Sequence, residues 1–236
     1  MYSFNERIRY SELDENRNLS LVSIINFMQD CCTYEAEDGG VGIDWLKERN
    51  TAWMLISWQV KILRRPAYCE HVKITTWASG FRHFLGMRNF TIENSETGEL
   101  LIYAYSEWAY VNTKTGKPER QIPEKEIQVY APQEPLDKEF EKGRITVPET
   151  LTAVPPITVS EFHIDTNHHV NNAQYVALAC SVLPEGSAHF KDFRCEVRQQ
   201  SVLGDILFPY VGREGDATVV VLNDPEGKPK LTARFA

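Results

Sequence analysis

No apolar run in this 236-residue sequence approaches the length needed to cross a bilayer, and its first residues lack the basic start and apolar stretch of a signal peptide. We therefore expect a cytoplasmic protein with no membrane span. The five cysteines form neither a zinc pattern nor a disulfide framework, so we expect reduced thiols that lie mostly in the core. A net charge of −8 without a long Lys/Arg block argues against nucleic-acid binding, which requires neutralisation of phosphates.

Several catalytic and cofactor motifs are also absent. No GxSxG occurs, which disfavours a serine hydrolase of the α/β type. The glycines of residues 39–42 form neither GxGxxG nor a phosphate-binding loop, and we expect a turn followed by a short helix there. The sequence thus predicts no cofactor.

The order of apolar patterns predicts an α+β protein. Within residues 12–37, apolar side chains recur at helical spacing after Ser20, which is a suitable N-cap. From residue 53 onward, runs rich in aromatic and β-branched residues alternate with turn sequences, as in an antiparallel sheet with one exposed face. Residues 131–150 are rich in proline and charge and predict a linker. A second, more compact helix-then-strands pattern follows.

Residues 161–175 concentrate short polar side chains at the start of a predicted helix more than any other part of the chain. If residues 163–169 are extended, side chains two apart share a face, so Asp165, Asn167 and His169 point to one side. A carboxylate, an amide and an imidazole are the groups of a hydrolytic site.

The helix that follows this polar row adds a further feature. Asn171 or Asn172 is a natural N-cap, and apolar residues recur at helical spacing from Tyr175 onward. The free N–H groups of the first turn, with the positive end of the helix dipole, can polarise a carbonyl and stabilise the oxyanion formed when it is attacked.

Two other interpretations of the same residues stay open. Asp, Asn and His also gather at turns because their side chains hydrogen-bond to the local backbone. His163, His168 and His169 suggest metal ligation, but no HExxH or paired CxxC accompanies them, so we expect no metal.

The stretch DTNHHVNNAQY, residues 165–175, resembles the D-x-N-x-H-V-N-N-x-x-Y sequence of plant and bacterial acyl-ACP thioesterases. The resemblance implies two hotdog units in tandem, each a helix wrapped by an antiparallel sheet. It implies hydrolysis of fatty acyl thioesters of acyl carrier protein, with Asp165, Asn167 and His169 as the catalytic residues. We expect an N-terminal hotdog over residues 1–130, a linker over 131–150 and a catalytic C-terminal hotdog over 151–236.

An internal repeat agrees with a tandem arrangement. Placing residues 14–20 over residues 165–171 preserves an Asp, an Asn and the helix that follows. Asn18 stands where the second copy has His169, so the first copy is expected to be a degenerate site that lacks the chemistry.

The resemblance fails at one position. The family carries a Glu on the strand after the catalytic helix, and counting back from Gly204 places Gln200 there. Because an amide cannot accept a proton, Gln200 is a doubtful catalytic residue, and Asp165 is expected to be the only base. Glu196 lies four residues earlier and would share a face with Gln200 on a regular strand.

The sequence also suggests where a substrate would bind. Candidates for an acyl pocket, each of which would fit an ordinary core equally well, are Phe27, Met28, Met54 and Trp58. Candidates for docking of an acidic acyl carrier protein are Lys61, Arg64 and Arg65. An acyl-CoA hydrolase and a non-catalytic acyl-binding hotdog protein remain alternatives, and the oligomeric state, a homo-oligomer included, is left open.

Overall fold

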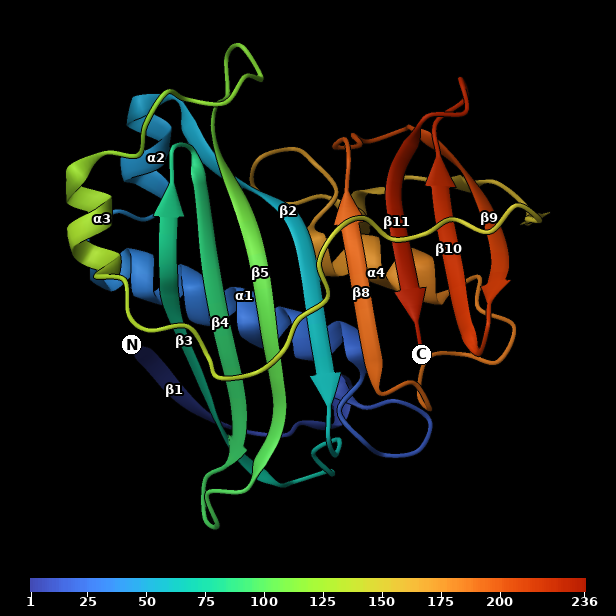
Figure 1. Ribbon diagram of the computed structural model, residues 1–236, viewed down its shortest axis with the longest axis horizontal. Helices are drawn as coiled ribbons and strands as arrows, with labels where there is room; N and C mark the ends of the chain where they lie inside the picture. Colours follow the sequence, from blue (N-terminus) through green and yellow to red (C-terminus); the bar gives the residue numbers. More distant parts are fainter.

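The computed structural model describes residues 1–236 and contains one antiparallel sheet with helices against one of its faces (Figure 1). The long strands of the first half are β1 (Tyr2–Arg7), β2 (Thr51–Ile62), β3 (His71–Arg82), β4 (Leu85–Asn94) and β5 (Leu100–Asn112). Those of the second half are β8 (Asp192–Val197), β9 (Ile206–Glu214), β10 (Ala217–Asn223) and β11 (Pro229–Phe235), with two short strands, β6 (Thr152–Ala153) and β7 (Ile157–Thr158).

The strand order is β1-β3-β4-β5-β2-β8-β11-β10-β9-β6, with β7 paired to β9. The two halves therefore join into one sheet through β2 and β8. This seam runs from the pair Ser57–Glu196 to the pair Lys61–Asp192.

Two helices carry the apolar side chains that pack on this sheet. The helix predicted after Ser20 is confirmed as α1 (Leu21–Asp38), and the Ser20 hydroxyl accepts a hydrogen bond from the Ser23 N–H at 3.2 Å. The second helix is α4 (Asn172–Cys180). A core of 37 buried apolar residues spans both halves and includes residues of both helices.

Shorter helices complete the fold. The predicted short helix is confirmed as α2 (Ile43–Arg49), and α3 (Glu124–Tyr130) ends the first half. Two 3₁₀ helices, η1 (Tyr10–Glu12) and η2 (Glu161–His163), precede the two loops that the sequence repeat aligns. No helix in the structure has the length and apolar character required to cross a membrane.

The predicted linker contains no helix or strand but is hydrogen-bonded to the sheet. We call residues 133–145 the strap; Figure 1 shows it crossing the face opposite α1 and α4. The Gln59 side chain donates to the Glu141 carbonyl at 2.9 Å and accepts from the Glu141 N–H at 2.8 Å. On this face of β3, Lys73 is exposed as predicted, whereas Thr75 is only 9% exposed, so the prediction of a solvated face fails at Thr75 alone of these two.

All five cysteines are free thiols. Cys31 and Cys195 are fully buried, whereas the other three are half-buried. We expected most of the five cysteines to lie in the core, and only Cys31 and Cys195 are fully buried there.

Candidate active site

The polar row is a tight turn, so the prediction of an extended segment over residues 163–169 was wrong. After η2, an isolated bridge between Ile164 and Val170 closes a loop, within which the Asp165 N–H donates to the His169 carbonyl at 2.8 Å. His168 adopts a left-handed φ of 61°, which no strand allows. Asp165, Asn167 and His169 therefore project from a turn and do not form a row on one face.

The Asp165 carboxylate causes this turn. Its Oδ1 accepts hydrogen bonds from the N–H of Asn167 at 2.8 Å and of His169 at 3.3 Å. Such side chain-to-backbone bonds compete with strand pairing and favour a turn. The local-turn interpretation thus accounts for one oxygen of Asp165, whereas Oδ2 accepts no hydrogen bond from the chain and is free for chemistry.

The other two predicted catalytic side chains are available to a substrate. Asn167 is exposed and His169 is half-buried, and neither side chain hydrogen-bonds within the protein. The structure brings the three residues into one five-residue loop without hydrogen bonds between their side chains.

Helix α4 begins directly after this loop, as predicted, and Asn171 is its N-cap. The Asn171 side chain accepts from the Ala173 N–H at 2.8 Å. The N–H groups of Asn172 and Gln174 have no acceptor within the chain, because both belong to the first helical turn. Two free amide donors thus lie at the positive end of a helix beside the candidate base.

A residue that the sequence did not single out fixes the position of this helix start. The Asn172 side chain donates to the Gln29 side chain at 2.9 Å, which joins the first residue of α4 to the middle of α1. The partners are 143 positions apart, so no local pattern could reveal the contact.

The remaining histidines of the row are not arranged as metal ligands. The His163 Nδ1 accepts from the Ser160 N–H at 3.0 Å, and this bond belongs to the cap of η2. His168 is exposed on the turn. The chain contains no group of three or more His, Cys, Asp or Glu side chains placed to hold a metal ion.

The aligned loop of the first half has the same internal hydrogen bonds. The Asp14 N–H donates to the Asn18 carbonyl at 2.7 Å, and Asp14 Oδ1 accepts from the N–H groups of Asn16 and Asn18 at 2.9 and 3.0 Å. Arg17 has the left-handed φ of 63° that corresponds to His168. The sequence repeat therefore corresponds to a repeated loop structure.

The same correspondence locates Gln200. In the first half the Leu19 N–H donates to the Pro66 carbonyl, and in the second the Val170 N–H donates to the Ser201 carbonyl, both at 2.8 Å. Arg65 and Gln200 immediately precede these two acceptors and are therefore equivalent.

The side chain of Arg65 fills the degenerate site. Its guanidinium donates to the carbonyls of Leu19 at 3.0 Å and of Ser187 and Phe190 at 3.1 Å. Burial lowers the pKa of Arg65, and the negative charge of Asp14 opposes that shift. By this equivalence, Gln200 takes the position of Arg65 and carries an uncharged amide in place of the guanidinium.

Contrary to what the sequence had led us to expect, Gln200 does not lie on a strand. Strand β8 ends at Val197, so Gln200 lies in the loop beyond it and cannot share a strand face with Glu196. The Tyr175 hydroxyl donates to the Gln199 carbonyl at 3.1 Å, which joins this loop to α4, and burial raises the pKa of Tyr175 to about 12.

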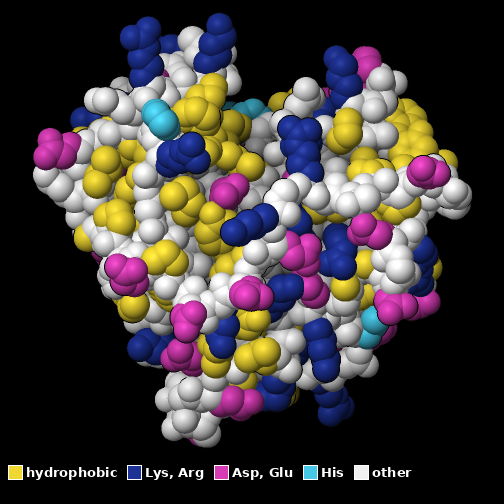
Figure 2. Space-filling view, in the orientation of Figure 1, with side chains coloured by type: hydrophobic (Ala, Val, Ile, Leu, Met, Phe, Trp, Pro, Cys, Tyr) yellow, Lys and Arg dark blue, Asp and Glu magenta, His cyan; other side chains and the backbone are white.

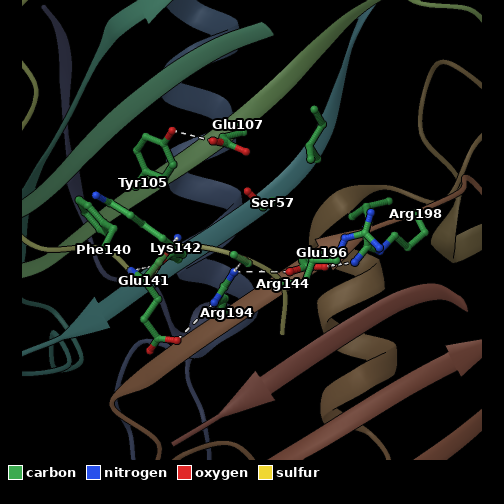
Figure 3. Close-up of a pocket in the computed structure, with 14 residues that line it drawn as sticks. Ser57, Tyr105, Glu107, Phe140, Glu141, Lys142, Arg144, Arg194, Glu196 and Arg198 are labelled. Atoms are coloured by element: carbon green, nitrogen blue, oxygen red, sulfur yellow. Dashed lines mark hydrogen bonds and ion pairs between the residues drawn. The ribbon is translucent and has the colours of Figure 1, made fainter. Parts of the chain in front are cut away.

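Glu196 lies on the strapped face, because it alternates with Phe193, Cys195 and Val197 of the core. It lines a pocket of about 440 Å³ between β2, β5, β8 and the strap (Figure 3). Its carboxylate accepts from the Ile145 N–H at 2.7 Å and pairs with Arg194 and Arg198. Glu196 is thus already fully engaged in holding the strap.

The three candidate carrier-docking residues already have partners within the chain. Arg64 pairs with Glu70 and Glu99, both at 2.8 Å, and Lys61 pairs with Asp192. Arg65 is engaged with the three carbonyls described above. Figure 2 shows acidic and basic side chains interspersed on the strapped face. A docking role for these three residues stays a prediction.

Three of the proposed acyl-pocket residues are packed into the core. Phe27 is 3% exposed, and Met28 and Trp58 are fully buried. Met54 is half-buried.

Comparisons with known proteins agree with the resemblance seen in the motif. A family model described as the acyl-ACP thioesterase N-terminal domain matches residues 1–130. The chloroplastic acyl-[acyl-carrier-protein] hydrolase FATB3 of Cuphea viscosissima is 26% identical over 232 residues, covering 90% of this chain and 56% of the relative. The chloroplastic palmitoyl-acyl carrier protein thioesterase of Gossypium hirsutum is 26% identical over 222 residues, covering 86% and 54%. The chain thus spans about half the length of these relatives.

Solved structures show the fold. An acyl-ACP thioesterase from Bacteroides thetaiotaomicron aligns with a TM-score of 0.87 at 24% identity, over 99% of this chain and 96% of its own. The 12:0-ACP thioesterase from Umbellularia californica aligns with a TM-score of 0.80 at 22% identity, over 99% and 95%. The predicted α+β fold of tandem hotdog units is confirmed.

Proposed function

Because the chain belongs to the acyl-ACP thioesterase family, we propose that it hydrolyses a fatty acyl thioester of acyl carrier protein to a free fatty acid and the carrier thiol. The observation that supports this most directly is the Asp165 turn followed by the open N-terminus of α4. It provides a carboxylate with one free oxygen next to two free N–H donors.

In the first step, Asp165 Oδ2 accepts a proton from a water molecule, and the water oxygen adds to the thioester carbonyl carbon. Asn167 and His169 lie on the same loop and orient the water and the carbonyl. Gln200 adds an amide that can hydrogen-bond to either of them.

The carbonyl oxygen becomes an oxyanion, which the N–H groups of Asn172 and Gln174 stabilise together with the helix dipole. When the oxyanion collapses, the carbon–sulfur bond breaks and the electron pair leaves on sulfur. A thiol has a pKa of about 8.5, so the leaving thiolate needs little assistance and takes the proton held by Asp165.

Three further expectations belong to this proposal. The first is the division into a hotdog over residues 1–130, a linker over 131–150 and a catalytic hotdog over 151–236, supported by the strap between α3 and β6. The second is an acyl carrier protein as the partner. The third is a cytoplasmic location, for which the five free thiols are suited.

The test compares Asp165→Asn with Asp14→Asn. Both carboxylates accept two backbone N–H bonds within the same turn, so the two substitutions perturb equivalent loops. Loss of the base should lower kcat/KM for acyl-ACP by about 100-fold or more in Asp165→Asn. Asp14→Asn should retain the parent's rate per folded molecule. Equal rates in the two folded variants would remove Asp165 from the chemistry, and matched acyl-CoA substrates measure the carrier preference.

A further inference from the structure

The contact between α4 and α1 sets a direction for the acyl chain. The Asn172–Gln29 hydrogen bond places the proposed oxyanion donors beside residue 29, at the middle of α1. From there, the second half of α1 runs along the sheet of the first unit, where it packs on β3 (Figure 1). An acyl chain that leaves the thioester toward this apolar interior follows α1 from Gln29 toward its C-terminus.

A buried polar cluster crosses that path. We call it the polar belt; it consists of Cys32, Glu35, Thr76 and Arg88. The Arg88 guanidinium forms an ion pair with Glu35 and donates to Thr76 Oγ1 at 3.0 Å and to Cys32 Sγ at 3.4 Å. Arg88 is 8% exposed and Glu35 7%, so both charges lie inside the protein.

On three elements the belt residues lie between the main apolar core and a small second cluster. On α1, it separates Met28 of the main core from Ala36 of a small second cluster. On β3, Thr76 likewise separates Ile74 from Ala78.

On β4, Phe90 of the main core is paired with Thr76, and Arg88 is paired with Ala78 of the second cluster. The Arg88 guanidinium reaches back from there to Thr76, between the two clusters. The second cluster beyond the belt includes Tyr130, whose ring centre lies 4.9 Å from the Arg88 guanidinium carbon. The belt therefore divides the interior of the first unit into two compartments.

We propose that the polar belt ends the acyl-binding site and makes medium-chain acyl groups, of about eight to ten carbons, the preferred substrates. The proposal rests on the proposed thioesterase function. Cys32 also packs against the main core and behaves as a small apolar residue, so on α1 the path ends at the charged Glu35. From Gln29 to Glu35 the helix rises about 9 Å, at 1.5 Å per residue. An extended alkyl chain advances about 1.3 Å per carbon, as C–C bonds of about 1.5 Å dictate, so about seven methylenes fill this length. The carbonyl carbon and the carbon next to it lie beside α4, and adding them to the seven methylenes gives an acyl group of about nine carbons.

The belt stops a longer chain because alkyl carbons cannot replace its hydrogen bonds. Inserting a methylene between Arg88 and Glu35 would leave two buried charges unpaired, which costs far more than burial of the methylene gains. The main-core side of the belt can adapt, since Met28 is unbranched and flexible and can move aside for a ligand.

The experiment measures kcat/KM of the parent for acyl-ACP substrates of 6 to 18 carbons, alongside the double variant Glu35→Leu/Arg88→Met. The double variant removes both charges together and retains side chains of similar size. Thr76 keeps its hydrogen bond to the Asn89 carbonyl at 3.2 Å, so no buried charge is stranded. Melting temperatures report whether it folds.

The control is Glu126→Gln. Glu126 is fully buried beyond the belt, where it accepts hydrogen bonds from Trp53 at 2.7 Å and Trp45 at 3.4 Å. This variant alters a buried carboxylate without altering the belt, so its chain-length profile should match that of the parent.

We expect the parent to prefer 8- to 10-carbon substrates, and the double variant to gain at least about tenfold for 14- to 16-carbon relative to 8-carbon substrates. A parent preference for 16 or 18 carbons overturns the proposal, whether or not the double variant folds. So does an unchanged profile in a folded double variant, or a shift of equal size in Glu126→Gln. Absence of hydrolysis at every chain length would instead refute the thioesterase function.

Discussion

Substitution of Gln200 by arginine would give the catalytic loop the residue that the degenerate loop has at the equivalent position, Arg65. Arg65 fills the space beside Asp14, where its guanidinium donates to three backbone carbonyls at 3.0 to 3.1 Å. Because Gln200 precedes Ser201 as Arg65 precedes Pro66, an arginine there should reach Asp165 in the same way. The variant Gln200→Arg thus converts the active loop into its inactive counterpart by one change.

Two effects of the Gln200→Arg substitution determine how far kcat should fall. Arg65 donates to backbone carbonyls and not to Asp14, so the new guanidinium should act on Asp165 through its nearby charge. A positive charge that close lowers the affinity of a carboxylate for a proton by about 10- to 1,000-fold, and the rate of proton abstraction falls by roughly the square root of that factor. The bulk of the side chain also takes the place of the attacking water, and losing the base-activated water alone costs about 100-fold or more. We therefore expect kcat to fall by at least about 100-fold.

The assay is single-substrate hydrolysis of acyl-ACP at fixed pH, with melting temperature as the measure of folding. Gln199→Arg is the matched control, because Gln199 corresponds to Arg64, whose side chain pairs elsewhere on the surface. The control should keep the parent's rate within about threefold. If folded Gln200→Arg is as active as Gln199→Arg, the two loops are not functionally equivalent, and Gln200 is not beside Asp165.

Four further predictions concern the same loops and the basic residues Lys61, Arg64 and Arg65. Asp14→Ala removes the acceptor of two backbone hydrogen bonds and should cost about 1–3 kcal/mol of unfolding free energy, measured by urea denaturation, with turnover per folded molecule unchanged. Gln200→Glu should raise the rate and add one ionisation to the pH–rate profile, whereas a profile identical to the parent's would exclude residue 200 from the site. Arg64 lowers the pKa of Glu70 from 4.5 to about 2, so the pair's contribution to stability should be full above pH 4.5 and be lost as the pH falls toward 2. Thermal unfolding of Arg64→Gln against the parent tests this, and a loss confined to alkaline pH would contradict it. Arg64→Gln should also slow acyl-ACP hydrolysis more than hydrolysis of a short neutral thioester at low salt, and equal losses would place carrier docking elsewhere.

The elements of the fold could be read from the sequence because they depend on local periodicity. The apolar spacing predicted both central helices, and the structure confirms them. Ser20 is the predicted cap of the first, and of the two candidate caps of the second, Asn171 and Asn172, the structure has Asn171. The conformation of the polar row could not be read in the same way. Its period-two spacing also fits a turn, and the Asp165 carboxylate decides the outcome by binding two N–H groups of its own loop.

Contacts between distant residues account for what the sequence left undetermined. Nothing near Gln29 indicates that it holds the start of α4, and nothing in residues 61–66 distinguishes the half-buried Arg65 from the exposed Arg64. A charged residue at a strand end is ordinarily solvated, so its engagement across the two halves appears only once both are placed. The loop position of Gln200 depends similarly on where β8 ends.

The strap makes assembly of the two halves an intramolecular reaction. It is bonded to Gln59 on β2 and to Arg194 and Glu196 on β8, so it bridges the two strands that form the seam. A tether of this kind corresponds to a local concentration of about millimolar, which adds to the seam and the shared core that join the halves. Cleavage within the strap, for example at Gly143, would turn the chain into a complex of two fragments. Its specific activity should then fall once the enzyme is diluted below the dissociation constant that the seam and the shared core set. The intact chain cannot lose one half by dilution, because the strap joins the two halves covalently.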